Sequence, residues 1–506
     1  MASNPMNTEG AAPATEFFMW RWYKLFVGDI TSNRISTVGG YMATFGTLSG
    51  IVYIVMTFLY HAESAYGGII FMSIVPPAFF GGLLLVPLGI YREFRRRRKD
   101  DPSLGEKPLG AILQTLSGHG DLRNRIIIFV LFTGINVALT MIIFTASLEY
   151  LDTPSFCGQL CHSVMTPEFT AYKRSPHARV PCVQCHIGPG ASWFVKSKIS
   201  GLRQVYAVMA KTYSRPIPTP IEQLRPARDT CEQCHWPEKF HQDKLKVITH
   251  YKNDRNNTKY YTALLLKVGG PEAEGAPATG IHWHVSRGNR VIYASEKGER
   301  KDIVWIRFER NGQPPVEYRF TGSSLSDAQI AALPKRTMDC VDCHNRPTHI
   351  YRTPDTELET MFGRFPELLT VPYLKKAASE VFSRHFSEDA IRSGEVGKAL
   401  QAWYDAYPEE KPEPRLLKLA ADKVQEIYRQ NVWPTMNIGW GTYPDHIGHP
   451  GSIGHTGSLG CFRCHGNNHV TAEGKAIRSD CRLCHTILAL EEEKPPLFDF
   501  MVHKEK

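Results

Sequence analysis

The sequence predicts a mainly α-helical protein with extensive irregular structure, three transmembrane helices and a small β insertion. Three observations lead to this prediction. The first 150 residues contain three long apolar runs without charged residues, at about 41–60, 68–91 and 126–147. Beyond them, cysteine pairs recur in segments with little regular periodicity. Between 244 and 330, apolar and polar residues alternate over short stretches, as in strands separated by turns.

Each apolar run is about 20 residues or longer, which is enough to cross a bilayer core of roughly 30 Å. A buried soluble helix is the alternative, but three uncharged runs of this length disfavour it. The loop after the second run contains Arg92-Glu-Phe-Arg-Arg-Arg-Arg-Lys99, whereas His61 to Gly67, after the first run, has no Lys or Arg. The positive-inside rule therefore predicts a cytoplasmic N-terminus and places the chain after about Ser147 in the periplasm.

The formal net charge of +9 does not indicate a nucleic-acid partner. A basic run such as 92–99 can bind nucleic acid in principle. Its position at the end of an apolar run makes a role in membrane topology the better interpretation. We expect the membrane, and no nucleic acid, to be the partner of this segment.

All twelve cysteines fall into six pairs, and a histidine follows each pair directly. C-x-x-C-H is the attachment signature of a c-type haem: the thiols form thioethers to the porphyrin, and the adjacent imidazole ligates the iron. A zinc half-site or redox dithiol would explain one pair, but not six with no cysteine left over. The first pair has one extra spacer residue. The pattern predicts six covalently bound haems. The thioether cysteines are Cys157, Cys161, Cys182, Cys185, Cys231, Cys234, Cys340, Cys343, Cys461, Cys464, Cys481 and Cys484. The proximal histidines are His162, His186, His235, His344, His465 and His485.

Each haem iron needs a second axial ligand unless it binds substrate. Residues that flank the motifs are the best candidates, because the chain must wrap tightly around closely spaced porphyrins. A methionine after the first motif would raise the reduction potential of that haem, although a packing role is the alternative. The favoured second ligands are Met165, His177, His241, His349, His446, His449 and His469. The remaining histidines that could serve are His61, His250, His282, His284, His385, His455 and His503.

The spacing of the motifs and the change in pattern predict four segments. Residues 1–150 form the membrane anchor, and 151–243 form a three-haem domain. Residues 244–330 form the β-rich insertion, and 331–506 form a C-terminal three-haem domain. The irregular structure of both haem domains is expected to wrap the haems.

The stretch from about Phe156 to Phe240 resembles the NapC/NirT family of membrane-anchored multihaem quinol dehydrogenases. The resemblance is carried by the first motif with Met165, by Tyr172-Lys-Arg-Ser-Pro-His177 before the second motif, and by the basic segment before the third. It implies that Met165 ligates the first haem and that His177 is a distal ligand. It covers under a fifth of the chain, and the chain has more apolar runs and more haem motifs than the family usually has.

The family also lines a quinol pocket with a lysine and an acidic residue from the basic segment. Lys196 and Lys198 are the lysines that match this pattern, and Gln204 stands where the acidic residue is expected. The resemblance therefore implies a quinol site formed by these three residues. The proton acceptor of that site departs from the family pattern.

The resemblance implies an inner-membrane quinol:cytochrome c oxidoreductase of anaerobic respiration. It would pass electrons from menaquinol or another quinol through six haems to periplasmic c-type cytochromes, as larger relatives in metal-reducing bacteria do. Two alternatives are a terminal reductase of a small substrate and a non-catalytic relay subunit of a larger complex. Reductase haems often carry an altered motif such as C-x-x-C-K, which this sequence lacks.

Overall fold

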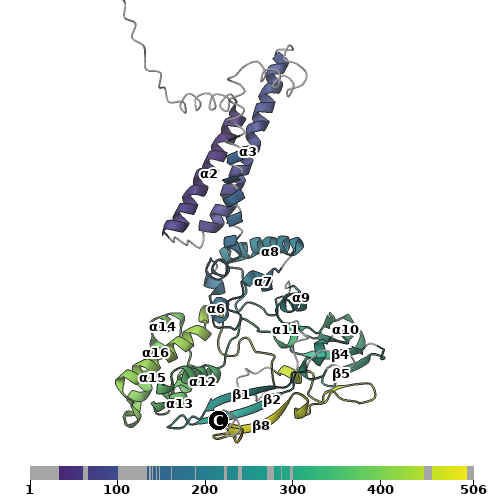
Figure 1. The fold of residues 1–506 in the computed structure, drawn as a ribbon, viewed down its shortest axis with the longest axis vertical. Coiled ribbons are helices and arrows are strands. Elements are labelled where there is room, and N and C mark those ends of the chain that lie inside the picture. Colours follow the sequence, from purple (N-terminus) through teal and green to yellow (C-terminus); the bar gives the residue numbers. More distant parts are fainter. Residues whose placement is uncertain are drawn as a thin grey trace, which may run out of the picture. The chain divides into compact units, whose positions relative to one another are not determined.

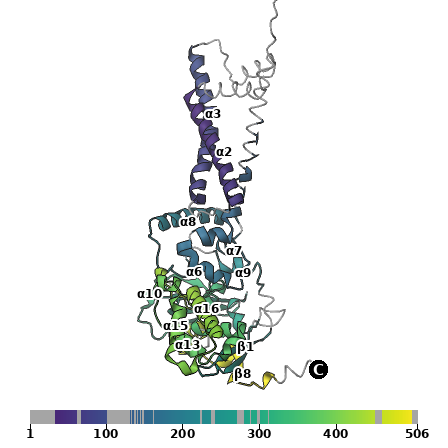
Figure 2. The same ribbon diagram turned by 90° about the vertical axis from the view of Figure 1, so that its left-hand side faces the viewer.

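The computed structural model describes residues 33–60, 67–100, single positions between 131 and 150, and most of 151–498 (Figures 1 and 2). Within the last range, the residues outside the description are 161, 189, 222–224, 237–241, 270–278, 287, 297–299, 311 and 450–458. The chain divides into two compact units, Met1–Leu160 and Cys161–Lys506. Each unit has its own architecture.

The first unit is built on two long helices, α2 (Arg34–Tyr60) and α3 (Gly67–Asp100), which pack against each other. Glycines allow their backbones to approach closely. A Cβ atom added to Gly82 would lie 2.5 Å from the backbone nitrogen of Ala43, and one added to Gly46 would meet the facing helix at 2.6 Å. Larger residues at these positions would force the helices apart, so the hairpin depends on them.

The prediction of three transmembrane helices is wrong for the part of the chain that the structure describes. No described helix is both long enough and apolar enough to cross a membrane. The runs 41–60 and 68–91 do form parts of α2 and α3. However, α2 contains several glycine, serine and threonine residues, and α3 contains three prolines and ends in an arginine-rich segment. The third run, 126–147, lies largely outside the described residues.

The second unit contains a cluster of five helices around an apolar core (Figure 1). These are α12 (Pro354–Arg364), α13 (Leu374–Phe382), α14 (Glu388–Arg392), α15 (Glu395–Ala406) and α16 (Pro414–Asn431). Local sequence fixes the start of α12: the Thr353 side chain accepts a hydrogen bond from the backbone N–H of Thr356, and Pro354 occupies the first helical turn. Leu358, Leu400 and Val424 are fully buried between the helices.

The other helices of the second unit carry most of the motifs or connect them. They are α6 (His162–Lys173), α7 (Cys182–His186), α8 (Ala191–Met209), α9 (Ala227–Cys231), α10 (Asp327–Ala332) and α11 (Cys340–Cys343). A capping box starts α10: the Ser326 hydroxyl accepts from the Gln329 backbone, and the Gln329 side chain accepts from the Ser326 backbone.

Two antiparallel sheets complete the second unit. The first has the order β1-β2-β8, and the second has the order β6-β3-β4-β5-β7. In the first, His250 pairs with Tyr260 across β1 and β2. The strands are β1 (Lys244–Tyr251), β2 (Lys259–Leu266), β3 (Asn289–Ser295), β4 (Ile303–Arg310), β5 (Val316–Phe320), β6 (Arg336–Thr337), β7 (His469–Val470) and β8 (His485–Glu492).

The sheets correct the rest of the predicted fold class, which was mainly α with a small β insertion. The strands β1 to β5 do lie between 244 and 330, but β7 and β8 come from the C-terminal segment and extend one sheet each. Their pattern is hard to read in sequence because β7 has two residues and β8 begins at the motif histidine His485. The β structure is therefore interwoven with the motif-bearing segments.

The helical core gives a test of the fold. Leu400→Ala should lower the free energy of unfolding by about 2–5 kcal/mol, because it removes a fully buried side chain and leaves a cavity. Lys398→Ala, on the exposed side of the same helix, should change it by less than about 0.5 kcal/mol. Thermal unfolding followed by circular dichroism measures both. Equal effects of the two substitutions would contradict this packing.

Candidate haem-binding centres

The second to sixth motifs lie on or beside short helical turns of the second unit. The second motif forms α7, the third begins at the last residue of α9, and the fourth begins with α11. The fifth and sixth begin in 3₁₀ turns, Gly460–Arg463 and Cys481–Leu483. Residues three apart share one side of a helical turn. Both thiols of a C-x-x-C pair can therefore be presented in one direction, as two thioether bonds to one porphyrin require.

The first motif differs from the others in backbone as well as in spacing. Phe156–Leu160 forms a π-helical turn, which contains Cys157 and the spacer residues. The i→i+5 hydrogen bonding of such a turn is wider than that of an α-helix, and it accommodates the extra residue. Cys161 lies outside the described residues, and His162 is the first residue of α6. Met165 lies one turn further along α6 and is partly buried.

Each motif histidine from the second to the sixth motif faces one histidine from outside the motifs. The distances between ring centres are 5.8 Å for His235–His177, 6.2 Å for His186–His349, 6.4 Å for His344–His282, 5.8 Å for His465–His284 and 6.3 Å for His485–His449. Two metal–imidazole bonds of about 2 Å each, with roughly 1 Å from each nitrogen to its ring centre, require a separation of about 6 Å. All five pairs therefore fit axial ligation of one iron between two imidazoles.

Backbone carbonyls orient many of these rings through the second ring nitrogen. A histidine that binds metal commonly donates its other N–H to such an acceptor, which fixes the tautomer that leaves Nε2 a lone pair for the metal. The contacts from Nδ1 to a carbonyl oxygen are 3.0 Å from His177 to Pro347, 2.9 Å from His349 to Glu168, 3.1 Å from His282 to Val268, 2.8 Å from His284 to Ile281 and 2.8 Å from His465 to Arg478. These contacts fix the orientation of the five rings.

Burial also favours the neutral imidazole, which is the form that binds metal. It lowers the pKa of His186 to about 4, with a smaller contribution from the neighbouring His349. Burial is likewise the main cause that lowers the pKa values of His282, His284 and His344 below their ordinary value. These side chains are therefore predominantly neutral at physiological pH.

From the second to the sixth, the motifs follow one another in space in the order of the sequence. Helices α7 and α9 are in contact, and so are α9 and α11. Side chains of successive motifs interact: Cys185 with Cys231 and Cys234, Cys231 with Cys340, Cys343 with Cys464, and Cys461 with Cys484. The five centres therefore form one continuous array.

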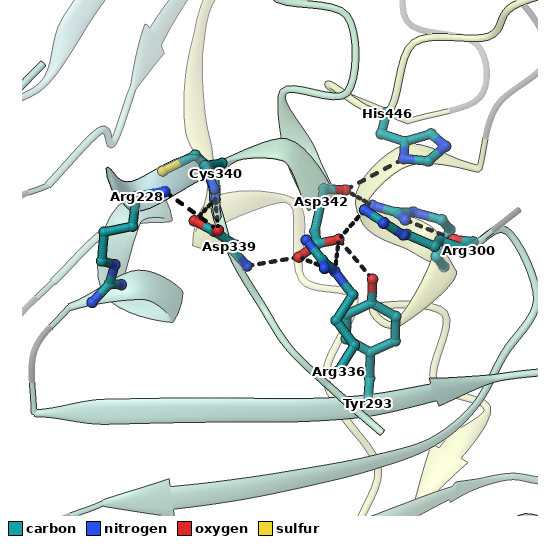
Figure 3. A network of polar contacts seen from close by, with 10 residues as sticks. Arg228, Tyr293, Arg300, Arg336, Asp339, Cys340, Asp342 and His446 are labelled. Atoms are coloured by element: carbon teal, nitrogen blue, oxygen red, sulfur yellow. Dashed lines mark hydrogen bonds and ion pairs between the residues drawn. The ribbon is translucent and has the colours of Figure 1, made fainter. Parts of the chain in front are cut away.

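A buried polar network connects the fourth motif to the fifth (Figure 3). Asp342, a spacer residue of the fourth motif, is 2% exposed, and its carboxylate accepts hydrogen bonds from the Tyr293 hydroxyl at 2.7 Å and from Arg336 Nε at 2.8 Å. Arg300 Nη1 lies 3.2 Å from the same oxygen. The backbone carbonyl of Asp342 accepts from Nη2 of Arg463, a spacer residue of the fifth motif, at 2.6 Å. Two motif spacers thus hold two centres at a fixed separation.

A second carboxylate connects the third motif to the fourth. Asp339 precedes Cys340, and its Oδ1 accepts from the Cys340 backbone N–H at 2.7 Å. Its Oδ2 accepts from the backbone N–H of Ala227, at the start of α9, at 2.9 Å. A carboxylate is favourable at the N-terminus of a helix because it satisfies unpaired N–H groups there.

The structure separates the sequence-predicted distal ligands into two groups. His177, His349 and His449 lie in the histidine pairs described above. His446 and His469 do not: both are buried, and His469 Nε2 donates to the Ile303 carbonyl at 2.9 Å. Burial lowers the pKa of His446 to about 4, and its Nδ1 lies 3.3 Å from the Asp342 carbonyl oxygen. His241 lies outside the described residues.

His282 and His284 were not among the favoured ligands, although they face the fourth and fifth motif histidines. They lie in the 3₁₀ turn Ile281–Val285, between β2 and β3 and far from any motif in sequence. Residues that flank motifs were preferred as ligands, and these two histidines were therefore not selected. The signal available in the sequence was the H-x-H spacing, which places two imidazoles close enough to serve neighbouring centres.

The predicted quinol residues Lys196, Lys198 and Gln204 all lie on α8. Lys196 is exposed, with Nζ 4.7 Å from the centre of the Trp193 ring. The side-chain amide of Gln204 donates to Ser200 Oγ at 3.3 Å. With about 100° per residue, Lys196 and Lys198 leave the helix in nearly opposite directions, so one ligand on α8 could contact only one of them.

Comparisons with known proteins agree with the motif pattern. The model of the NapC/NirT cytochrome c family, N-terminal region, matches residues 122–219. The cytochrome c-type protein ImcH of Geobacter sulfurreducens is 39% identical over 466 residues, which are 92% of this chain and 89% of that protein. No solved structure matches the chain.

The histidine pairs predict which substitutions change a haem. His284→Met should raise the reduction potential of one haem, because methionine in place of an imidazole ligand favours the reduced iron. His446→Gln should leave every potential in place, because His446 faces no motif histidine. Potentiometric titration of the purified protein, followed by visible absorption, measures both. A shift with His446→Gln but not with His284→Met would overturn the pairing.

Proposed function

Because the chain belongs to the NapC/NirT cytochrome c family, we propose that it is a quinol dehydrogenase. It would oxidise menaquinol or a similar quinol at the bacterial inner membrane and pass the electrons through six covalently bound c-type haems to periplasmic c-type cytochromes. Family membership supports the general part of this proposal, namely that the protein is a membrane-associated multihaem cytochrome in electron transfer. The continuous array of five histidine pairs supports transfer of electrons between haems, and the basic helix α8 is the observation that supports quinol as the electron donor.

The proposed axial ligands follow from these pairs. His186 with His349, His235 with His177, His344 with His282, His465 with His284, and His485 with His449 would each hold one haem iron. His162 and Met165 would hold the first, as the family resemblance implies. Bound haem supplies one-electron chemistry at iron. The chain fixes the order and spacing of the sites.

The array favours electron transfer over reduction of a small substrate. Two imidazoles fill both axial positions of an iron, so the five paired centres would offer a substrate no open coordination site. This argument supports a quinol dehydrogenase and a non-catalytic relay subunit equally, and disfavours a terminal reductase at these centres. The basic helix α8, with a lysine to receive the quinol oxygen, favours the dehydrogenase of the two. A lysine there would donate a hydrogen bond to the quinol oxygen and stabilise the anion formed as its proton leaves.

The haem count is a direct prediction of this proposal. A pyridine haemochrome assay together with intact mass should give six covalent haems per chain, because six complete motifs use all twelve cysteines. A count of five, with Cys157 or Cys161 unmodified, would show that the wider π-helical turn does not present its two sulfurs to a porphyrin.

The quinol site gives a second prediction. Replacing Lys196 and Lys198 together by Met should slow quinol-driven haem reduction at least about tenfold, equivalent to about 1.4 kcal/mol of activation free energy. Lys211→Met, just beyond the end of α8, is the matched control and should leave the rate in place. Reduction by dithionite, which needs no quinol site, should be the same in all variants. If the double variant oxidises quinol as fast as the unmodified protein, the quinol pocket lies elsewhere.

A further inference from the structure

Helix α8 presents a stripe of large apolar side chains to its surroundings. Ile199, Leu202, Tyr206 and Met209 are each 65–70% exposed in the described part of the chain. Their spacing of three, four and three residues places them within roughly 80° of the helix circumference. Single exposed apolar residues are ordinary, but a contiguous patch of this kind marks a contact surface. We refer to these four residues as the apolar stripe.

The helix is already fixed to the second unit by a different face. Val208 packs against the buried cluster that contains Val164, Met436 and Tyr443. With about 100° per residue, Val208 lies on the far side of the helix from the centre of the apolar stripe. The stripe is therefore not the core-facing side of an amphipathic helix. It is a second apolar face that the described residues of the unit do not cover.

The charges on α8 indicate what covers this face. The helix contains no Asp or Glu. Lys198 borders the apolar stripe on one side, and Arg203 and Lys196 border it on the other, as their helical spacing requires. Apolar residues flanked by basic residues are typical of helices that lie in a membrane interface, where long basic side chains reach the anionic headgroups.

We propose that α8 is an interfacial helix whose apolar stripe inserts into the surface of a lipid bilayer rich in anionic headgroups. A second copy of this chain is a less favourable occupant of the apolar stripe, because two stripes placed face to face would bring their flanking basic residues together. The aromatic ring of Tyr206 suits the headgroup region, since one end of it is apolar and the other polar. The proposal does not depend on quinol oxidation.

Photo-crosslinking of the full haem-loaded chain in lipid nanodiscs tests this proposal. The photoreactive residue p-benzoylphenylalanine would replace Leu202 in one protein and Tyr206 in another. It would replace Ser393, an exposed residue of the helical cluster, in the control. Irradiation in nanodiscs that contain phosphatidylglycerol should give phospholipid adducts, detected by mass spectrometry, at 202 and 206 but not at 393. The visible spectrum and haem content confirm that each variant has folded.

The basic flanks are tested by lipid composition. Adduct yield at 202 should be at least about fivefold higher in phosphatidylglycerol than in phosphatidylcholine nanodiscs, since each basic residue gains from the anionic surface. Replacing Arg203 by Gln should reduce that preference. A crosslinked dimer of this chain, an adduct with another protein, or a lipid yield no higher at 202 than at 393 would each overturn the proposal. Quinol turnover is measured separately. A failure of the bilayer-insertion proposal can therefore be distinguished from a failure of the proposed quinol dehydrogenase function.

Discussion

The separation of about 6 Å between paired imidazoles is the constraint on which the second unit depends. A motif histidine has a fixed place beside its cysteines, and from the second to the sixth motif the chain brings a second histidine from elsewhere to about 6 Å from it. The partner of His186 follows the fourth motif, and the partner of His485 precedes the fifth. One 3₁₀ turn supplies the partners for both the fourth and the fifth. Segments distant in sequence are thereby brought together at each of these five centres.

Residues that lie between the two cysteines of a motif make much of the polar contact that connects one centre to the next. Asp342 is a buried carboxylate satisfied by Tyr293, Arg300 and Arg336, and its carbonyl binds Arg463 of the next motif. Removing one partner of such a buried group costs more than the bond itself, because the remaining charge stays desolvated and unpaired. Asp342 and Arg463 are therefore constrained by this network as well as by their place between two cysteines. Electron transfer depends steeply on separation, so a fixed distance between motifs matters for function.

The sequence predicted the motifs because a haem is attached through adjacent residues. It also predicted a β-rich segment at 244–330, where β1 to β5 lie, because the alternation there is local. It missed β7 and β8, because β7 is short and β8 begins inside a motif. It also overestimated the ability of α2 and α3 to cross a membrane, because the length of the uncharged runs was counted while glycine, hydroxyl residues and proline received little weight. The histidines that face the motif histidines were harder still to predict, because His282 and His284 reach their partners only through tertiary structure. His446 and His469 flank a motif in sequence, yet their surroundings are carbonyls and buried side chains.

The central claim is that five centres have two imidazole ligands each and that the first differs. Near-infrared magnetic circular dichroism of the fully oxidised protein tests it most directly, because low-spin ferric haems with two histidines and with histidine and methionine have separate charge-transfer bands. The account predicts a band intensity that corresponds to five bis-histidine haems, with the remaining haem outside that band. Fewer than five bis-histidine haems in a fully loaded protein would contradict it.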